Sequence, residues 1–298
     1  MLRDLLPHLP VVLAVARRNG FAAAAAELGM SPSAVSHAVR AVELRLGTPL
    51  FARTTRSVAL TEAGTALLGA IAPAMRDIED ALERQGSAAG RIGGVLRINA
   101  PRIALPLAIT PILAALARRH PELVVEVIAD DALTDIVAAG FDAGVRLGEM
   151  IAQDMVAVRL TPPFRTALVA SPEYLAARGE PKTIAELSQH NCIGYRLLAS
   201  GAAYAWELRE GGKDVAVDVA GSARVTDALH ARELALAGIG IAYLFVPLAA
   251  AELDAGRLRE VLPAHAIEEP GLFLYFPRRA AEAPKLRAFI EAVRDILP

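Results

Sequence analysis

The sequence predicts a winged helix-turn-helix at the N-terminus, mostly α-helical with a β wing, followed by a long helix and an α/β domain. Three observations support this order. Glycine and proline divide the first 60 residues into short helices, apolar residues then recur at spacings of three and four, and strand-like and helix-like segments alternate from residue 95 onward. At 298 residues the chain is long enough for two or three domains.

Charge is unevenly distributed along the chain. The whole sequence carries a net charge of −2, whereas residues 1–60 alone carry +4 and the remainder −6. Hydrophobic residues make up 54% and charged residues 21%, a composition that excludes wholesale disorder. A basic N-terminal region on an otherwise acidic chain favours a nucleic-acid partner for that region.

Two helices joined by a tight turn are expected at residues 21–28 and 32–46. Alanine, the best helix former, fills the first helix, and Gly29 ends it. Ser31 supplies an N-cap oxygen for the second helix, whose first position holds Pro32. Helical spacing places one apolar stripe toward the core, made of Val35, Val39, Val42 and Leu46. The opposite face carries Ser33, His37 and Arg40, with Ser36 at its edge.

A basic hairpin is expected over residues 49–60, after Gly47 closes the second helix. A polar, short-chained helix face suits the DNA major groove, and a hairpin with arginines around its tip suits the phosphate backbone or the minor groove. The predicted DNA-binding residues are Ser31, Ser33, Ser36, His37, Arg40, Arg53, Thr54 and Arg56. The alternative is an alanine-rich helical bundle without a DNA partner.

A long helix should run from Glu62 to Arg84, with Thr61 as its N-cap. Its apolar residues follow the a/d spacing of a two-stranded coiled coil and are predicted to pair two chains: Leu68, Ile71, Met75, Ile78 and Leu82. The alternative is a helix docked on its own domain. Pro73 would remove a backbone hydrogen bond, and the sequence leaves open whether the helix kinks there. Residues 85–94 have the glycine and small-residue content of a flexible joint.

The remaining sequence alternates between strand and helix patterns. Strands are expected at 95–99, 123–128, 143–147, 165–170, 192–196, 215–220, 239–245 and 272–276. Helices are expected at 105–120, 133–139, after the Ser171-Pro172 cap, at 227–237 and at 284–297. This order predicts a mainly parallel sheet with helices on both faces.

Such sheets bind ligands at the carboxyl ends of their strands, where helix N-termini present unpaired N–H groups. Three arginines near those ends, Arg102, Arg146 and Arg224, would suit a carboxylate, although each could instead form a structural ion pair. Aromatic residues could wall the site or belong to the core: Tyr195, Tyr204 and Trp206. The predicted effector-binding residues are Pro101, Arg102, Thr134, Arg146, Tyr195 and Thr226.

Four motifs together resemble the LysR-type transcriptional regulator family. They are Ser31-Pro32-Ser33-Ala34-Val35-Ser36, Val42-Glu43-Leu44-Arg45-Leu46-Gly47, Leu50-Phe51-Ala52-Arg53-Thr54-Thr55-Arg56 and Leu60-Thr61-Glu62-Ala63-Gly64. One departure is Gly20-Phe21-Ala22, where the family usually has Ser-Phe-Thr, so a hydroxyl N-cap is missing. From Leu96 onward the order of elements resembles the family's effector-binding domain, which has the two-lobed fold of periplasmic solute-binding proteins.

The resemblance implies a division into domains. Residues 1–60 would bind DNA, 61–91 would form a linker and dimerisation helix with a hinge, and 92–298 would bind the effector. Within the last, one lobe would comprise 92–161 and 267–298, and the other 162–266. The implied partners are promoter DNA, a small-molecule effector held between the lobes, a second chain through the 62–84 helix with further pairing into tetramers, and RNA polymerase during activation.

Other function classes find little support in the sequence. It contains no Gly-x-Ser-x-Gly, P-loop, His-Glu-x-x-His or Cys-x-x-Cys motif, so we expect neither an enzyme nor a bound metal or cofactor. The lone Cys192 is expected to be buried packing in a reducing compartment. No apolar run suggests a membrane span, which favours the cytoplasm. A stand-alone solute-binding protein is the main competitor, against which residues 1–60 and the lack of a secretion signal argue.

Overall fold

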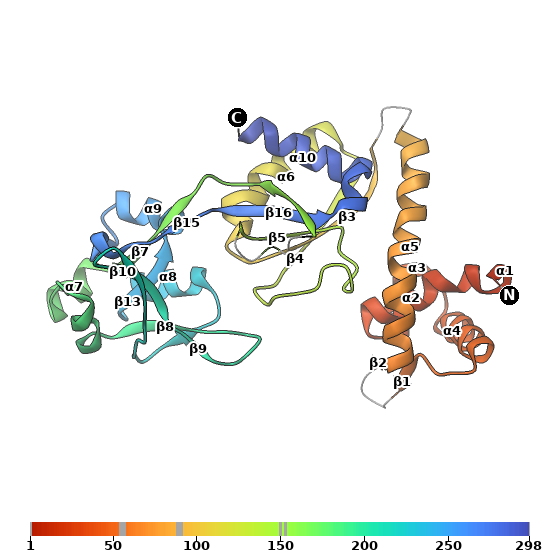
Figure 1. Cartoon of the computed structure of the whole chain (residues 1–298), viewed down its shortest axis with the longest axis horizontal. Coiled ribbons are helices and arrows are strands. Elements are labelled where there is room, and N and C mark those ends of the chain that lie inside the picture. The colour runs from red at the N-terminus through yellow and green to blue at the C-terminus, as the bar shows by residue number, and fades with distance from the viewer. Residues whose placement is uncertain (1, 54–57, 88–91, 149–150, 152–153, 298) are drawn as a thin grey trace. The chain divides into compact units, whose positions relative to one another are not determined.

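The computed structural model describes residues 2–53, 58–87, 92–148, 151 and 154–297 (Figure 1). Two compact units make up the chain. One comprises Met1–Ile92 with Asp135–Asp142, and the other comprises Gly93–Thr134 with Ala143–Pro298. None of the described helices is both long enough and apolar enough to cross a membrane.

The first unit confirms the expected pair of helices and the hairpin. Its elements are α1 (Leu2–Leu5), η1 (Leu6–His8), α2 (Leu9–Arg18), α3 (Phe21–Leu28), α4 (Pro32–Leu46), β1 (Phe51–Arg53), β2 (Val58–Leu60) and α5 (Glu62–Ser87). The Ser31 hydroxyl accepts a hydrogen bond from the Ala34 N–H at 3.2 Å, as an N-cap should. Gly29 and Gly47 end their helices with φ of 63° and 70°, the left-handed conformation that glycine adopts readily.

The core of this unit forms around the inner face of α4. Val35, Val39 and Val42 are fully buried there, packed with residues of α2, α3 and β1. Leu46 was expected in the same stripe, but it is 40% exposed. The stripe instead includes Ala38, and Leu50 and Phe51 close the core beyond the end of the helix. The chain folds back before the last turn of α4 can be covered.

The helix α5 begins as predicted, because the Thr61 hydroxyl accepts a hydrogen bond from the Gly64 N–H at 3.0 Å. It continues to Ser87, so the predicted joint from residue 85 starts too early, and Pro73 lies inside the helix. Leu68 is 7% exposed within the core of its own unit, and Ile71 packs against that core. The first part of the apolar stripe is therefore used inside the chain, whereas Ile78 is 47% exposed.

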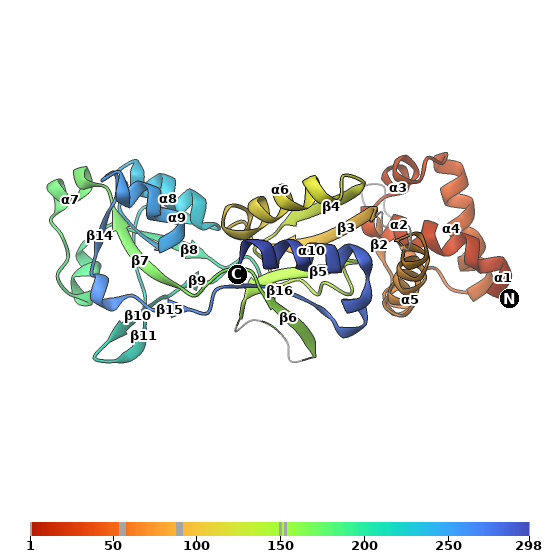
Figure 2. The ribbon, with the colours of Figure 1, turned by 90° about the horizontal axis from the view of Figure 1, so that it is seen from above.

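The second unit contains two mixed sheets. The first has the strand order β4 (Leu123–Ala129), β3 (Gly94–Ala100), β5 (Ala143–Leu147), β16 (Leu272–Pro277) and β6 (Met155–Arg159). A π-helical turn, η2 (Leu105–Ile109), leads into α6 (Thr110–Arg119), and η6 (Arg278–Glu282) precedes α10 (Pro284–Ile296). Figure 2 shows α6 and α10 side by side, and α10 also contacts β3.

The second sheet has the order β12 (Arg224–Val225), β8 (Cys192–Arg196), β13 (Ile241–Phe245), β7 (Phe164–Ala170) and β14 (Arg259–Val261). Two short strands extend it, β9 (Ala203–Tyr204) on β8 and β15 (Glu268–Glu269) on β7. The other elements are α7 (Pro172–Arg178), η4 (Ile184–Gln189), the hairpin of β10 (Trp206–Glu210) and β11 (Lys213–Val217), α8 (Ala228–Leu236), α9 (Val246–Asp254) and η5 (Pro263–His265).

Both faces of the second sheet are covered. Alanines of α8 and α9 pack on one face, against residues such as Val169 and Ile193. Residues of α7, η4 and the β10–β11 hairpin pack on the other, against residues such as Leu168 and Tyr243. The chain passes between the two sheets twice, from β6 to β7 and from β15 to β16. The Leu160 N–H donates to the Leu272 carbonyl at 2.8 Å and so links the two connections.

Three expectations for the chain after residue 92 are wrong. The sheets are not mainly parallel, because β16 runs antiparallel to β5 and β6, and β7 runs antiparallel to β13 and β14. The predicted helix at 133–139 is a single turn, since the Asp135 carboxylate accepts from the Val137 and Ala138 N–H groups and Gly140 then takes a φ of 80°. The strand predicted at 215–220 is β11, which ends at Val217. The sequence did not predict helix α9 or the strands β6, β9, β10, β12, β14 and β15.

Candidate DNA interface and effector site

The outward face of α4 is the candidate DNA-reading surface. Ser33, His37 and Arg40 are exposed, and Ser36 is half-buried at the edge of that face. Within the described part of the chain neither His37 nor Arg40 forms a hydrogen bond or an ion pair. Ser31 and Ser33 share a hydrogen bond of 3.0 Å. The predicted residues of α4 therefore lie together and project their polar groups outward.

The hairpin follows α4 closely. Phe51 pairs with Leu60, and Arg53 with Val58, in the antiparallel ladder of β1 and β2. The carboxylate of Glu43 on α4 accepts hydrogen bonds from the Leu50 and Phe51 N–H groups, at 2.9 and 3.3 Å. The Arg53 side chain and the predicted contacts Thr54 and Arg56 lie outside the described residues.

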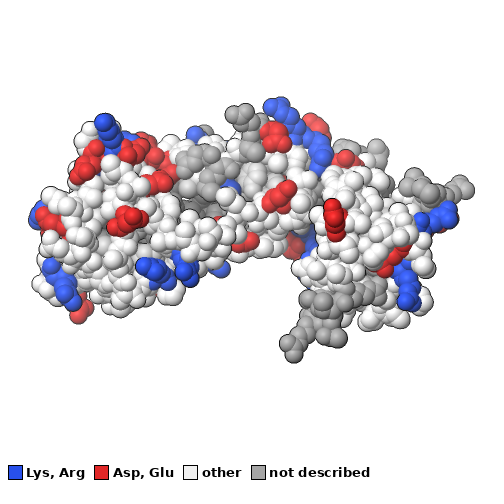
Figure 3. Space-filling view, turned by 60° about the horizontal axis from the view of Figure 1, so that its bottom comes forward, with Lys and Arg blue, Asp and Glu red and all other residues white. Residues whose placement is uncertain are grey.

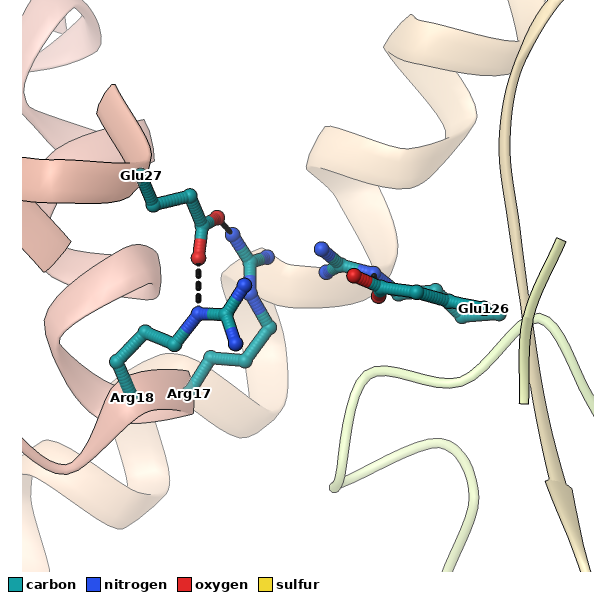
Figure 4. A network of polar contacts seen from close by, with 5 residues as sticks. Arg17, Arg18, Glu27 and Glu126 are labelled. Carbon is teal, nitrogen blue, oxygen red and sulfur yellow. Dashed lines mark hydrogen bonds and ion pairs between the residues drawn. The ribbon is translucent and has the colours of Figure 1, made fainter. Parts of the chain in front are cut away.

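Two arginines of α2 anchor α3 in the same unit. The Glu27 carboxylate accepts hydrogen bonds from Arg17 and Arg18, one on each oxygen (Figure 4). Burial works to raise the pKa of Glu27, but the hydrogen bonds and charges of the two guanidinium groups outweigh it and hold that pKa below its ordinary value. This ion pair joins α2 to the helix that precedes the turn into α4.

Surface charge is mixed on one face of the molecule (Figure 3). In Figure 3, acidic and basic side chains lie interspersed over the described surface of the face in view. The net charge of −2 agrees with this. A DNA interface on this protein is therefore a local feature and not a property of the whole surface.

The carboxyl end of the first sheet brings together several of the predicted effector residues. Arg146 on β5 is 4% exposed. Its guanidinium donates to the Val145 carbonyl at 2.7 Å, the Asn99 amide oxygen at 2.7 Å and the Ala132 carbonyl at 2.6 Å. Burial lowers the pKa of Arg146, against the opposing influence of Tyr275 and of nearby carboxylates. Arg146 thus fixes the loop after β4 to β3 and β5.

Arg102 lies beside the same loop and is paired. Its guanidinium donates to Asp131 at 2.8 Å, and its backbone N–H donates to the other oxygen of that carboxylate at 2.9 Å. The Arg102 side chain is nevertheless 40% exposed. Thr134 donates to Asp130 at 3.4 Å, and Pro101 is half-buried. Asp131 was not predicted from the sequence, because only the fold brings the loop after β4 next to the loop after β3.

The other predicted residues lie in or beside the second sheet. Thr226 is exposed next to Asp227, which caps α8 by accepting from the His230 N–H at 2.8 Å. Tyr195 is half-buried and donates its hydroxyl hydrogen to the Tyr243 carbonyl at 2.7 Å. Trp206 is fully buried and stacks on Tyr243, so it belongs to the core and does not wall a cleft. Arg224 is exposed on β12, and Tyr204 is half-buried on β9.

Comparison with known proteins decides the family. Residues 6–65 match the bacterial regulatory helix-turn-helix model of the lysR family, and residues 89–298 match the LysR substrate binding domain. The chain belongs to the LysR family of transcriptional regulators. This regulator is 40% identical over 281 residues to the uncharacterized HTH-type transcriptional regulator YcaN of Escherichia coli K12, covering 94% of this chain and 92% of YcaN.

Two further relatives support the assignment. The HTH-type transcriptional regulator PgrR of Escherichia coli K12 is 35% identical, covering 99% of this chain and 98% of PgrR. The structure of CrgA, a LysR-type transcriptional regulator from Neisseria meningitidis, is 25% identical with a TM-score of 0.62 and covers 98% of this chain and 99% of CrgA. This LysR-type protein is thus a transcriptional regulator with a DNA-binding domain and an α/β effector-binding domain of two lobes.

The single thiol of this LysR-type regulator is buried in an environment that disfavours the reactive thiolate. Cys192 is buried, its sulfur lies 3.6 Å from the Leu187 carbonyl oxygen, and burial raises its pKa to about 12. The described residues contain no group of three or more His, Cys, Asp or Glu side chains placed to hold a metal ion. Two features of the DNA-binding unit were not predicted from the sequence, the exposure of Arg45 and the contact of Glu43 with the hairpin.

Proposed function

We propose that α4 reads bases in the DNA major groove while the β1–β2 hairpin contacts the phosphate backbone or the minor groove. The observation that carries this proposal is the exposed polar face of α4, on which His37 and Arg40 have no partner within the described part of the chain. Side chains without internal partners are available for base edges and phosphates.

The salt dependence of DNA affinity tests these separate roles of α4 and the hairpin. The DNA is a duplex that the protein selects from a random-sequence pool. Arg53→Ala and Arg56→Ala should weaken binding to all sequences alike and each lower the salt slope by about one unit. Ser36→Ala and His37→Ala should instead change which bases are preferred. The proposal fails if the hairpin variants alter base preference while the helix variants do not.

We propose that a small effector carrying a carboxylate binds between the two lobes, against Pro101, Arg102, Thr134, Tyr195 and Thr226, with Arg146 shaping the loop. Its carboxylate would compete with Asp131 for the exposed part of Arg102. An uncharged apolar effector is the alternative, which the ion pair also permits because Asp131 already neutralises Arg102.

A panel of short mono- and dicarboxylates, screened by thermal shift, separates these possibilities. Arg102→Ala should weaken the affinity for a carboxylate hit about tenfold to a hundredfold, since a charge-assisted hydrogen bond contributes about 1.5 to 3 kcal/mol. Asp131→Asn should strengthen it by removing the competitor. Equal binding by wild type and both variants would refute the proposal.

We propose a homodimer, with further pairing into tetramers, built through the later part of α5. Leu68 and Ile71 are used within their own unit, so the pairing surface would include Met75 and the exposed Ile78, whereas the side chain of the predicted contact Leu82 lies outside the described residues. The Ile78→Glu variant should be monomeric by light scattering at micromolar concentration. Ala66→Glu, which adds the same charge at an exposed position on another part of the helix, should leave the assembly intact.

We further propose that the protein acts in the cytoplasm, contacts RNA polymerase when it activates transcription, and divides functionally at residues 60 and 91. The extents of the two family matches, 6–65 and 89–298, support those boundaries. A fragment of residues 92–298 should fold alone and retain effector binding. Loss of its cooperative thermal transition would contradict this division.

A further inference from the structure

The start of the hairpin is held by the recognition helix itself. One carboxylate oxygen of Glu43 accepts from two successive N–H groups, those of Leu50 and Phe51, at 2.9 and 3.3 Å. These two residues are only 1% and 4% exposed. Buried N–H groups are costly to leave without an acceptor, so Glu43 fixes the direction in which the chain enters β1.

The start of α5 holds the neighbouring backbone of Pro49 and Leu50 from the other side. The Thr61 N–H donates to the Leu50 carbonyl at 3.0 Å, and the Thr61 hydroxyl donates to the Pro49 carbonyl at 2.8 Å. Gly64 packs so closely that an added Cβ would lie 2.1 Å from the Leu50 carbonyl oxygen. The backbone at Pro49–Phe51 is therefore the point where α4, the hairpin and α5 are fastened together.

We propose that Glu43 is a positioning residue for DNA binding: by fastening Leu50 and Phe51 to α4, it sets the placement of the hairpin relative to the recognition helix. The inference rests on the proposed DNA interface, because it requires the hairpin to contact DNA. Only an acceptor oxygen is needed for this role, not a charge. A direct contact of Glu43 with a base is the competing role, and the charge would matter there.

The full-length protein and a fluorescent duplex selected from a random-sequence pool provide the test. Glu43→Ala should reduce affinity about tenfold and lower the salt slope by about one to two units, because the phosphate contacts of the hairpin are lost. Glu43→Gln keeps an acceptor oxygen of the same reach and should stay within about twofold of wild type. Glu62→Ala removes an exposed carboxylate close to the same site and serves as the charge-matched control.

Each outcome decides the matter. A Glu43→Ala protein with unchanged affinity and slope overturns the inference, and so does a Glu43→Gln protein that behaves like the alanine variant. If Glu43→Ala loses its helical circular dichroism, Thr61→Val decides instead: a reduced slope supports the inference and an unchanged slope overturns it. If Arg53→Ala and Arg56→Ala leave the slope unchanged, the hairpin does not touch DNA, and the proposed function fails at that step.

Discussion

The arginines of α4 and those at the carboxyl end of the first sheet have different environments. On α4, Arg40 is exposed and forms no ion pair within the described residues, as is also true of Arg45. In the α/β unit, Arg146 is buried with three acceptors and Arg102 is paired with Asp131. An arginine left without an internal partner is available to bind DNA. An arginine that already holds a loop mainly shapes the site. Its removal should lower the free energy of unfolding, whereas removal of an unpaired arginine should not, so stability measurements can separate the two kinds.

The largest effect is expected at Arg146. Arg146→Ala would leave the Asn99 amide oxygen and the Ala132 carbonyl without their donor and create a cavity, so the free energy of unfolding should fall by about 3 kcal/mol or more. Urea unfolding of the full-length protein measures it. Arg224→Ala, which removes an exposed arginine from the same unit, should change it by less than about 0.5 kcal/mol. Similar midpoints for the two variants would show that the hydrogen bonds of Arg146 contribute little.

A smaller, pH-dependent effect is expected at Glu27. Its pKa is lower in the folded protein than the ordinary value of 4.5, so its contribution is complete above pH 4.5 and is lost as the pH falls through the folded value. Glu27→Gln should therefore destabilise the protein by about 1 kcal/mol at pH 7, a modest figure because both arginines are partly exposed. Thermal melts at pH 7 and at a pH below the folded pKa of Glu27 test this, with Glu62→Gln as the control. A difference that persists at the lower pH would contradict the ion-pair explanation.

Arg102→Ala should cost still less, about 0.5 kcal/mol, because the pair is 40% exposed on the arginine side. The Asp131 carboxylate would keep the hydrogen bond from the backbone N–H of residue 102. Urea unfolding beside Arg146→Ala is the measurement. A loss above about 2 kcal/mol would show that Arg102 is as structural as Arg146, and would weaken its proposed role toward an effector.

Predictions from sequence succeeded where local residues determine the structure and failed where distant parts of the chain do. The α4 helix was predicted almost residue by residue, because Ser31, Pro32 and Gly47 fix its ends and a period of 3.6 fixes its faces. The prediction that Leu46 is buried failed because burial at a helix end depends on where the chain goes next. The partner of Arg102 was not predicted for a related reason. Asp131 is 29 residues away in the sequence, and the two residues meet only because β3 pairs with β4.

The direction of a strand in its sheet also could not be predicted from the local sequence pattern. The segment at 272–276 was recognised as a strand, but nothing in its sequence shows that it inserts between β5 and β6 and runs antiparallel to both. The helix predicted at 133–139 had helical spacing, yet Asp135 and Gly140 favoured a single turn. Short polar side chains that hydrogen-bond the backbone compete with a helix, and spacing alone does not weigh that competition.

The smallest stability effect, and the most informative binding effect, is expected at Arg40. Arg40→Ala removes an exposed side chain that has no partner among the described residues, so the unfolding midpoint should hardly move. Its affinity for the selected duplex should nevertheless fall about tenfold, and the salt slope by about one unit, if the guanidinium meets a phosphate or a base edge. Arg45→Ala is the matched control, because Arg45 has the same charge on the same helix but lies about 140° further round it. Equal losses at both positions would mean that α4 contributes only diffuse positive charge and that its outward face does not enter the groove.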